Sequence, residues 1–261
     1  MNQTDQIALI HRLADAAGEA IRPYFRAEFG LETKADASPV THADRAAESA
    51  IRAILEAERP EDGVIGEEYG SVREAAALQW VIDPIDGTTS FVAGRPIFGT
   101  LIALMKDGWP IMGVIHQPIL GERWIGAVGQ PTTFKGAAAR TRACPELKEA
   151  ILATTSPQAF AEHDAEHFMA LAAKTARRRL IWGGDCYNYG LLASGHIDIV
   201  VEAGLKIHDF AALVPVVEGA GGLMCDWNGD PLSATSDGKV IALGDPARLE
   251  EVLEALACHH G

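Results

Sequence analysis

One segment carries most of the information in this chain: Trp80-Val81-Ile82-Asp83-Pro84-Ile85-Asp86-Gly87-Thr88-Thr89-Ser90. An apolar run typical of a strand ends at Asp83, and a Pro-Ile-Asp-Gly turn then brings Asp86 close to it. The hydroxyl residues that follow favour the start of a helix, where backbone N–H groups lack partners. Paired carboxylates bind hard divalent cations, and free N–H groups bind phosphate. The segment therefore predicts both halves of a metal-dependent phosphatase site.

Ordinary turns are the alternative interpretation, because Asp-Pro and Asp-Gly are common turn dipeptides. Three other stretches favour the metal site. Gly66-Glu67-Glu68 follows an apolar pair, Thr41-His42-Ala43-Asp44 lies further upstream, and His208-Asp209 lies far downstream. Glu67 and Glu68 by themselves would indicate a solvated acidic face. Beside the other stretches, Glu67 is predicted to join the metal site.

The composition indicates a globular protein with an acidic surface. A chain of 261 residues, 48% of them hydrophobic, can bury one large or two small cores. The net charge of −14 argues against nucleic acids and anionic membranes as partners, because both need basic surface. An acidic protein also repels a phosphate ester unless bound cations reverse the local field. The charge therefore strengthens the prediction of divalent metal.

Cysteine usage and the N-terminal sequence bear on location. The four cysteines are scattered without a Cys-x-x-Cys pair, so zinc and thioredoxin-like chemistry are not indicated. The first residues show no basic-then-apolar signal pattern, and no apolar run approaches the ~18 residues of a membrane span. We expect reduced thiols, a cytoplasmic location and no membrane partner.

Hydrophobic periodicity divides the chain into two halves. The first half predicts helices over 3–29 and 42–58, then an antiparallel meander over 99–106, 109–117 and 123–128. The second half predicts helices over 164–176, 185–194, 209–220 and 246–257, alternating with strands over 180–182, 197–201, 223–225 and 240–243. We expect an α+β domain over 1–140 with most metal ligands. An α/β domain over 141–261 would carry Asp209 and the residues that select the substrate.

The four motifs, in this order and spacing, resemble the inositol monophosphatase family over roughly residues 5–245. The resemblance implies an αβαβα layered fold of mixed α+β and α/β character. It also implies a homodimer and a magnesium-dependent phosphatase of small phosphate esters, with two to three ions per subunit.

The resemblance also implies a role for each motif residue. Its metal ligands are the carboxylates of four acidic residues and one backbone oxygen: Glu67, Asp83, Asp86, Asp209 and Ile85. Asp44 and Thr88 would orient the attacking water and accept its proton, with Glu67 assisting through the metal. The N–H groups of Gly87 and Thr88 would hold phosphate oxygens. Attack should be in line, without a phosphoenzyme.

The segment from Gly183 to Gly195 resembles the histidinol-phosphate phosphatase branch of the family. That resemblance implies histidinol phosphate as substrate and a place in histidine biosynthesis. A carboxylate would suit its ammonium group, and Asp185 and Glu202 are the candidates. His208 is a candidate for the ring pocket, although it stands where the family usually has Trp or Tyr. Asp185 is also a candidate helix N-cap.

Two other functions stay open at this stage. An inositol-1-phosphate or broad sugar-phosphate phosphatase would use the same metals, and Ser90 stands where inositol-type members commonly have Asn. A regulatory binding protein with dispensable catalysis is a more remote alternative. The remaining residues of interest receive no catalytic role. They are a possible loop lysine, a basic run, a packing cysteine and scattered histidines: Lys34, Arg177-Arg178-Arg179, Cys186, His11, His42, His116, His163, His167, His196 and His259-His260.

Overall fold

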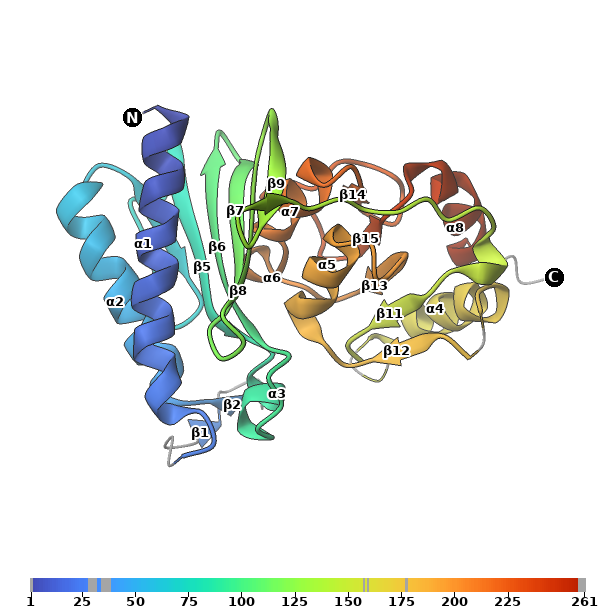
Figure 1. Cartoon of the computed structure of the whole chain (residues 1–261), viewed down its shortest axis with the longest axis horizontal. Coiled ribbons are helices and arrows are strands. Elements are labelled where there is room, and N and C mark those ends of the chain that lie inside the picture. Colours follow the sequence, from blue (N-terminus) through green and yellow to red (C-terminus); the bar gives the residue numbers. More distant parts are fainter. Residues whose placement is uncertain are drawn as a thin grey trace.

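The computed structural model describes residues 2–27, 32–33, 39–156, 158, 160–176 and 178–257. Lys34, Arg177 and the pair His259-His260, which the sequence singled out, lie outside these ranges. The described chain forms five layers, which follow one another across Figure 1 as helices, sheet, helices, sheet and helices. The expected αβαβα architecture is therefore confirmed.

The first two layers come from the N-terminal half. Helices α1 (Gln3–Ile21) and α2 (His42–Glu58) cover the outer face of an eight-stranded sheet of order β10-β9-β8-β7-β6-β5-β3-β4 (Figure 1). Every neighbouring pair in this sheet is antiparallel except β3 and β5, which are parallel. Its strands are β3 (Gly63–Gly66), β4 (Gly70–Val72), β5 (Leu78–Asp86), β6 (Gly99–Lys106), β7 (Trp109–Gln117), β8 (Glu122–Ala127), β9 (Gln130–Phe134) and β10 (Ala137–Ala138).

A short two-stranded sheet and a short helix stand near one end of this large sheet. The two strands, β1 (Glu32–Thr33) and β2 (Pro39–Val40), pair antiparallel just before α2. Helix α3 (Thr88–Val92) follows directly on β5. Figure 1 shows both features at the end of the sheet to which β5 runs. The decisive segment of the sequence therefore lies where this inner strand ends.

The C-terminal half supplies the other three layers. A five-stranded sheet of order β12-β11-β13-β15-β14 has α4 (Glu162–Lys174) and α8 (Leu249–Leu256) on its outer side (Figure 1). Helices α5 (Asp185–Ala193), α6 (Ile207–Phe210) and α7 (Leu213–Gly219) lie between the two sheets. The strands of this sheet are β11 (Leu152–Thr154), β12 (Leu180–Trp182), β13 (Ile199–Glu202), β14 (Leu223–Cys225) and β15 (Val240–Leu243).

The middle helices approach the large sheet so closely that two of its strands need glycine. A Cβ on Gly113 of β7 would lie 2.0 Å from the carbonyl oxygen of Ala212, and one on Gly126 of β8 would lie 2.0 Å from that of Pro215. Real Cβ atoms do not come this near a backbone oxygen, so any side chain at either position would force the layers apart. The two glycines thus fix the spacing at which α6 and α7 present their residues.

Most predicted elements occur with bounds within a few residues, and two do not. The first helix ends at Ile21 rather than at residue 29, because Pro23 follows in a 3-10 turn over 22–24. The single helix expected over 209–220 is split into α6 and α7. Pro215 explains the break, because it has no N–H to bond the carbonyl of Ala211 four residues earlier. The division into domains at residue 140 stays a prediction.

None of the helices in the described ranges combines the length and the apolar character needed to cross a membrane.

Candidate active site

Two aspartates at the end of β5 face the same way because the strand is irregular there. Side chains three residues apart in a regular strand point to opposite faces of the sheet. The pairing of β5 with β6 shifts register between Asp83 and Asp86, as it does at a β-bulge. Asp209, in the first turn of α6, completes the group. One carboxylate oxygen from each of the three residues lies within 4.8 Å of the others.

This carboxylate cluster is rich in negative charge and contains one buried oxygen without a partner. Asp83 Oδ1 is buried and has no hydrogen-bond partner in the described part of the chain. Burial, followed by the charges of Glu67 and Asp86, raises the pKa of Asp83 well above its ordinary value. Burial also raises the pKa of Asp86, with Asp185 adding to the effect. Buried oxygen donors that repel one another fit a hard divalent cation such as Mg²⁺.

Glu67 contributes to the cluster from the turn that follows β3. Its charge raises the pKa of both Asp83 and Asp209. The turn is held by Glu48, a buried residue of α2 that sequence reasoning missed. Glu48 accepts hydrogen bonds from the backbone N–H groups of the two residues that follow Glu67, Glu68 at 2.7 Å and Tyr69 at 3.2 Å. A helix residue remote in sequence thereby positions this candidate metal ligand.

The surroundings of Glu48 show why it was hard to identify from the sequence. Its charge is balanced by Arg52 one turn later on α2, at 2.7 Å, which is the pattern of an ordinary helix ion pair. The sequence held one indication of its role: Glu48 lies one turn after Asp44 on the same helix, and so on the same face. A Cβ on Gly66 would lie 1.9 Å from Glu48 Oε1, so only glycine leaves room for the carboxylate beneath the turn.

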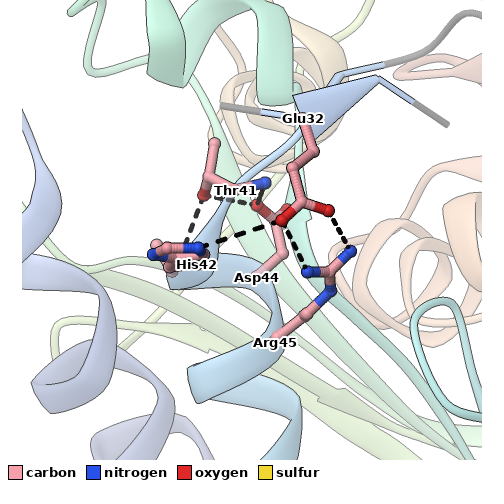
Figure 2. Close-up of polar contacts among 6 residues, drawn as sticks. Glu32, Thr41, His42, Asp44 and Arg45 are labelled. Carbon is pink, nitrogen blue, oxygen red and sulfur yellow. Dashed lines mark hydrogen bonds and ion pairs between the residues drawn. The ribbon is translucent and has the colours of Figure 1, made fainter. Parts of the chain in front are cut away.

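Asp44 is fixed at the start of α2 by a capping box with Thr41 (Figure 2). The hydroxyl and the N–H of Thr41 both donate to Asp44 Oδ2, at 2.6 Å and 2.8 Å. Burial raises the pKa of Asp44 to about 6, against the opposing effect of the two hydrogen bonds from Thr41. The nearby charges of Glu68 and Glu67 raise it further. A carboxyl group that ionises near neutral pH is suited to act as a general base.

The strand β1 is tied to the same end of α2. Figure 2 shows the carboxylate of Glu32 meeting the guanidinium of Arg45, with His42 beside them. The Arg45 nitrogens donate to the two Glu32 oxygens at 3.1 Å and 2.7 Å, and His42 Nε2 lies 3.9 Å from Glu32 Oε1. A bidentate ion pair of this kind fixes the relative orientation of the two side chains as well as their distance. It therefore sets where β1 passes the helix start that carries Asp44.

Three further predicted residues directly flank the second aspartate: Ile85 precedes it, and Gly87 and Thr88 follow it. Gly87 has φ of 87°, a left-handed conformation that favours glycine, and occupies the N-cap position of α3. The hydroxyl of Thr88 donates to the carbonyl oxygen of Ile85 at 3.0 Å. A carbonyl oxygen has two lone pairs, so this bond leaves Ile85 able to bind a cation as well.

A cavity of about 390 Å³ adjoins the carboxylate cluster. It lies between β5, the middle helices and the C-terminal sheet, and its lining combines acidic residues with aromatic and aliphatic ones. The lining residues are Asp86, Thr155, Ser156, Phe160, Asp185, Cys186, Tyr189, Glu202, Ala203, Gly204, Leu205, Asp209 and Leu213. The structure thus brings Asp185 and Glu202, the two carboxylates predicted to select the substrate, together with the cluster.

Asp185 does not cap α5, in contrast to one of the predictions. Gly184 occupies the N-cap position without a side-chain cap, and Asp185 is the first helical residue, with φ of 44°. Its Oδ2 instead accepts a hydrogen bond from the hydroxyl of Ser90 at 3.0 Å. Burial raises its pKa, opposed by that bond and by the charge of Arg95. The left-handed backbone turns the carboxylate toward α3. A capping role would instead have kept the carboxylate on the N–H groups of α5.

Glu202, at the end of β13, is held by two donors from the end of β11. Thr154 Oγ1 donates to Glu202 Oε2 at 3.1 Å, and the Thr155 N–H donates to Oε1 at 2.7 Å. Burial raises its pKa to about 7, despite these hydrogen bonds. The side chain is 4% exposed, so its charge is stabilised by few water molecules. Sequence reasoning found Glu202 but not the two threonines.

One predicted residue, His208, lies away from the cavity lining, and two tyrosines of α5 differ in whether they reach it. His208 is not among the described lining residues of the cavity; its Nε2 lies 3.5 Å from Asp209 Oδ1. The Tyr187 hydroxyl donates to Glu122 at 2.6 Å, away from the cavity lining. Tyr189 does line it, and its buried hydroxyl has no hydrogen-bond partner within the described ranges. Tyr189 was missed because an aromatic residue inside an apolar helix is usually core.

Comparison with known proteins agrees with this geometry. The model of the inositol monophosphatase family matches residues 2–260. The chain belongs to the inositol monophosphatase family. Members of this family are metal-dependent phosphatases of small phosphate esters, typically with Mg²⁺, so the chain is a phosphatase of this class.

Three similar proteins illustrate the breadth of this family. The bifunctional phosphatase IMPL2 of Arabidopsis thaliana is 46% identical over 267 residues, which cover 98% of this chain and 77% of that protein. A histidinol-phosphatase of Mycobacterium tuberculosis is 40% identical, covering 86% of this chain and 88% of that protein. A solved inositol monophosphatase of Zymomonas mobilis is 55% identical, with a TM-score of 0.91 over 99% of this chain and 100% of that one.

Proposed function

We propose that this phosphatase hydrolyses L-histidinol phosphate to L-histidinol and phosphate. The observation that carries the proposal is a pair of carboxylates in the cavity beside the metal cluster, the buried Glu202 and the half-buried Asp185. Histidinol phosphate offers an ammonium group and an imidazole to that cavity, whereas inositol phosphate offers only hydroxyls. A carboxylate removed from water gains most from a cationic partner. Relatives named histidinol-phosphatases at 40% and 35% identity support the same substrate.

The metal is proposed to be held by the group that the sequence indicated: Glu67, Asp83, Asp86, Asp209 and the carbonyl of Ile85. These donors are all oxygen atoms, which suits two to three Mg²⁺ ions per subunit. Magnesium held there supplies positive charge to the phosphoryl oxygens and makes a bound water more acidic. The unpartnered Asp83 Oδ1 is the atom that most requires such an ion.

The proton of the attacking water is proposed to pass to Asp44. Its pKa of about 6 leaves it largely ionised at neutral pH, and Thr41 keeps one of its oxygens fixed. Thr88 is proposed to orient the same water through its hydroxyl, which the Ile85 carbonyl holds in place. The N–H groups of Gly87 and Thr88 are proposed to contact the phosphate. The leaving alkoxide then departs toward the cavity that holds the rest of the substrate.

The cavity is proposed to bind the amino-alcohol end of the substrate. Glu202 and Asp185 would pair with the ammonium, and the free hydroxyl of Tyr189 would complete its hydrogen bonds. Phe160 and Leu205 offer the apolar contact that an imidazole ring needs on its faces. His208 is proposed to act at the rim, through Asp209. The setting we propose is a cytoplasmic homodimer in histidine biosynthesis, with domains over 1–140 and 141–261.

An inositol-phosphate phosphatase is the second candidate, favoured by the 55% identity to the Zymomonas mobilis inositol monophosphatase. A protein named Nus factor SuhB in Pasteurella multocida is 32% identical, which keeps a regulatory binding role as a remote third candidate. The net charge of −14 opposes that third role where the partner is a nucleic acid.

The deciding experiment is phosphate release in saturating Mg²⁺, with kcat/KM measured for histidinol phosphate and for inositol 1-phosphate. We expect a preference for histidinol phosphate of at least roughly a hundredfold, in line with rejection of an analogue that leaves buried polar groups unpaired. Asp86→Asn protein from the same preparation controls for contaminating phosphatase. Equal use of both substrates, or a preference for inositol phosphate, would overturn the proposal.

A further inference from the structure

A second group of potential metal ligands lies far along the chain from the carboxylate cluster, where α4 meets α8. A cavity of about 280 Å³ opens there, lined by His163, His167 and Trp227 among others. His163 and His167 stand one turn apart on α4, so their side chains project from the same face of the helix. Their Nε2 atoms are 2.9 Å apart, and their rings meet edge to face with centroids 4.2 Å apart.

The hydrogen bonds of the pair fix its protons. His167 Nδ1 contacts the carbonyl oxygen of Leu256, near the end of α8. A carbonyl oxygen only accepts, so Nδ1 carries the proton and the Nε2 of a neutral His167 is left with its lone pair. His163 then donates its own Nε2 proton to that lone pair. A backbone carbonyl that orients one ring nitrogen, with the other free to bind, is the usual setting of a metal-ligating histidine.

We infer that His163 and His167 together bind one divalent transition ion of the Zn²⁺, Ni²⁺ or Cu²⁺ class. Two histidines at this helical spacing are a known way to hold Zn²⁺. With metal–nitrogen distances of about 2.05 Å, ligands at right angles on one ion lie about 2.9 Å apart, and tetrahedral ligands about 3.3 Å apart. The observed separation matches the first value, and a small rotation of the exposed His163 ring provides the second.

Ligand type separates this bis-histidine site from the carboxylate cluster. Imidazole nitrogen suits Zn²⁺, Ni²⁺ and Cu²⁺, whereas carboxylates and water suit Mg²⁺. Asp164, a buried carboxylate that lines the same cavity, is already paired with Lys239 at 2.6 Å and is not needed as a ligand. Water fills the remaining positions of the ion.

An ion at this site would restrict the motion of residues that pack behind the substrate cavity. The ring of Trp227 lies 6.2 Å from that of His167 and 6.5 Å from that of Phe160. Phe160 lines the cavity beside the carboxylate cluster. The hydrogen bond of His167 to Leu256 already joins α4 to α8, and an ion on Nε2 would hold the ring in the orientation of that bond. The metal site does not depend on which phosphate ester the enzyme prefers.

Zn²⁺ titration of the full chain in saturating Mg²⁺ tests the inference, because Mg²⁺ occupies the carboxylate cluster. Isothermal calorimetry is expected to show one Zn²⁺ per chain, with affinity at least tenfold weaker in His163→Ala. The side chain of His163 is exposed, so the substitution leaves folding intact. His196→Ala, which removes another exposed histidine of the same half, is the matched control and is expected to bind as the wild type does.

Nitrogen-15 spectra of histidine side chains supply the second readout. Zn²⁺ is expected to move the His163 proton from Nε2 to Nδ1, since Nε2 must be free to bind the ion. A chain truncated after Ala257 is expected to show the same change. Wild-type binding by His163→Ala, Zn²⁺ uptake without a change in the His163 spectrum, or loss of the change on truncation would each overturn the inference.

Discussion

The pH dependence of substrate affinity follows from the burial of one carboxyl group. Glu202 has a pKa raised to about 7, because the protein removes most of its water and the two threonine donors only partly compensate. Below that pH the group is protonated and neutral, and above it the group is a carboxylate. An ammonium substrate needs the carboxylate, so its binding is present above pH 7 and is lost as the pH falls through 7.

The size of this effect can be calculated from the same value. A group of pKa about 7 is about nine-tenths ionised at pH 8 and about one-tenth ionised at pH 6. If only the ionised form binds the ammonium, KM for histidinol phosphate should rise about tenfold between these two pH values. Inositol 1-phosphate has no cationic group that could pair with Glu202, so its KM should not show this tenfold change. Protonation of the phosphate and of the metal ligands affects both substrates alike.

Glu202→Gln is the matched perturbation, because glutamine keeps the shape and cannot ionise. Its carbonyl can accept from the Thr155 N–H, and its NH₂ can donate to the Thr154 hydroxyl, so the fold should survive. Loss of a hydrogen bond to a charged group costs about 1.5–3 kcal/mol, or roughly 10- to 150-fold in KM at pH 8. The variant should also lack the tenfold change between pH 8 and pH 6.

The assay is initial-rate phosphate release from both substrates at pH 6, 7 and 8, for wild type and Glu202→Gln, in saturating Mg²⁺. The change in KM specific to histidinol phosphate should disappear in the variant. Parallel pH profiles for the two wild-type substrates would refute the assignment of Glu202 to the ammonium. So would a Glu202→Gln enzyme that retains the pH dependence, since imidazole protonation of the substrate would then be its source.

Three further predictions concern the groups around this cavity. Asp86→Asn should abolish turnover, and near-native turnover would contradict the metal assignment. The same substitution should raise the unfolding midpoint of the metal-free protein in calorimetry, because it removes one of several carboxylates that repel one another. Gly66→Ala should lower the free energy of unfolding by about 1–3 kcal/mol and weaken Mg²⁺ activation, because the methyl displaces Glu48; unchanged urea unfolding would contradict the close contact. Asp185→Asn, which tolerates the left-handed backbone and the Ser90 bond, should raise KM for histidinol phosphate about tenfold and spare p-nitrophenyl phosphate; equal losses would assign Asp185 to architecture.

The sequence predicted this fold where local pattern and final structure agree. The helix over 42–58 and the strands over 99–106 and 109–117 match the observed bounds, because the helix has a clear periodicity and the strands are apolar runs that end at turns. Helix α7 was misjudged because Pro215 acts on a carbonyl four residues back, in a segment that otherwise looks continuous. The strand β11, Leu152–Thr154, was not predicted from the sequence.

The site shows the same limit at the level of single residues. The candidate metal ligands could be predicted because they stand in dense motifs at element ends. Glu48, Thr154 and Thr155 were not, because each acts on a group that is distant in sequence, and nothing local distinguishes them from ordinary helix and strand residues. The histidines of α4 were dismissed for a related reason. Their spacing was visible, but the carbonyl that orients His167 belongs to another helix.

The arrangement separates the chemistry from the choice of substrate. The bulge of β5 and the start of α6 supply the metal cluster, while α5 and β13 supply the acidic groups of the cavity. Because Glu202 sits near its own pKa at neutral pH, its preference for a cation over a hydroxyl is set by a small free-energy difference. Lower pH should therefore weaken the preference for a cationic substrate, while protonation of Asp44, with its pKa of about 6, slows the hydrolysis of all esters alike. A family with one catalytic centre can thus diverge in substrate through a single buried carboxyl group and the donors that set its pKa.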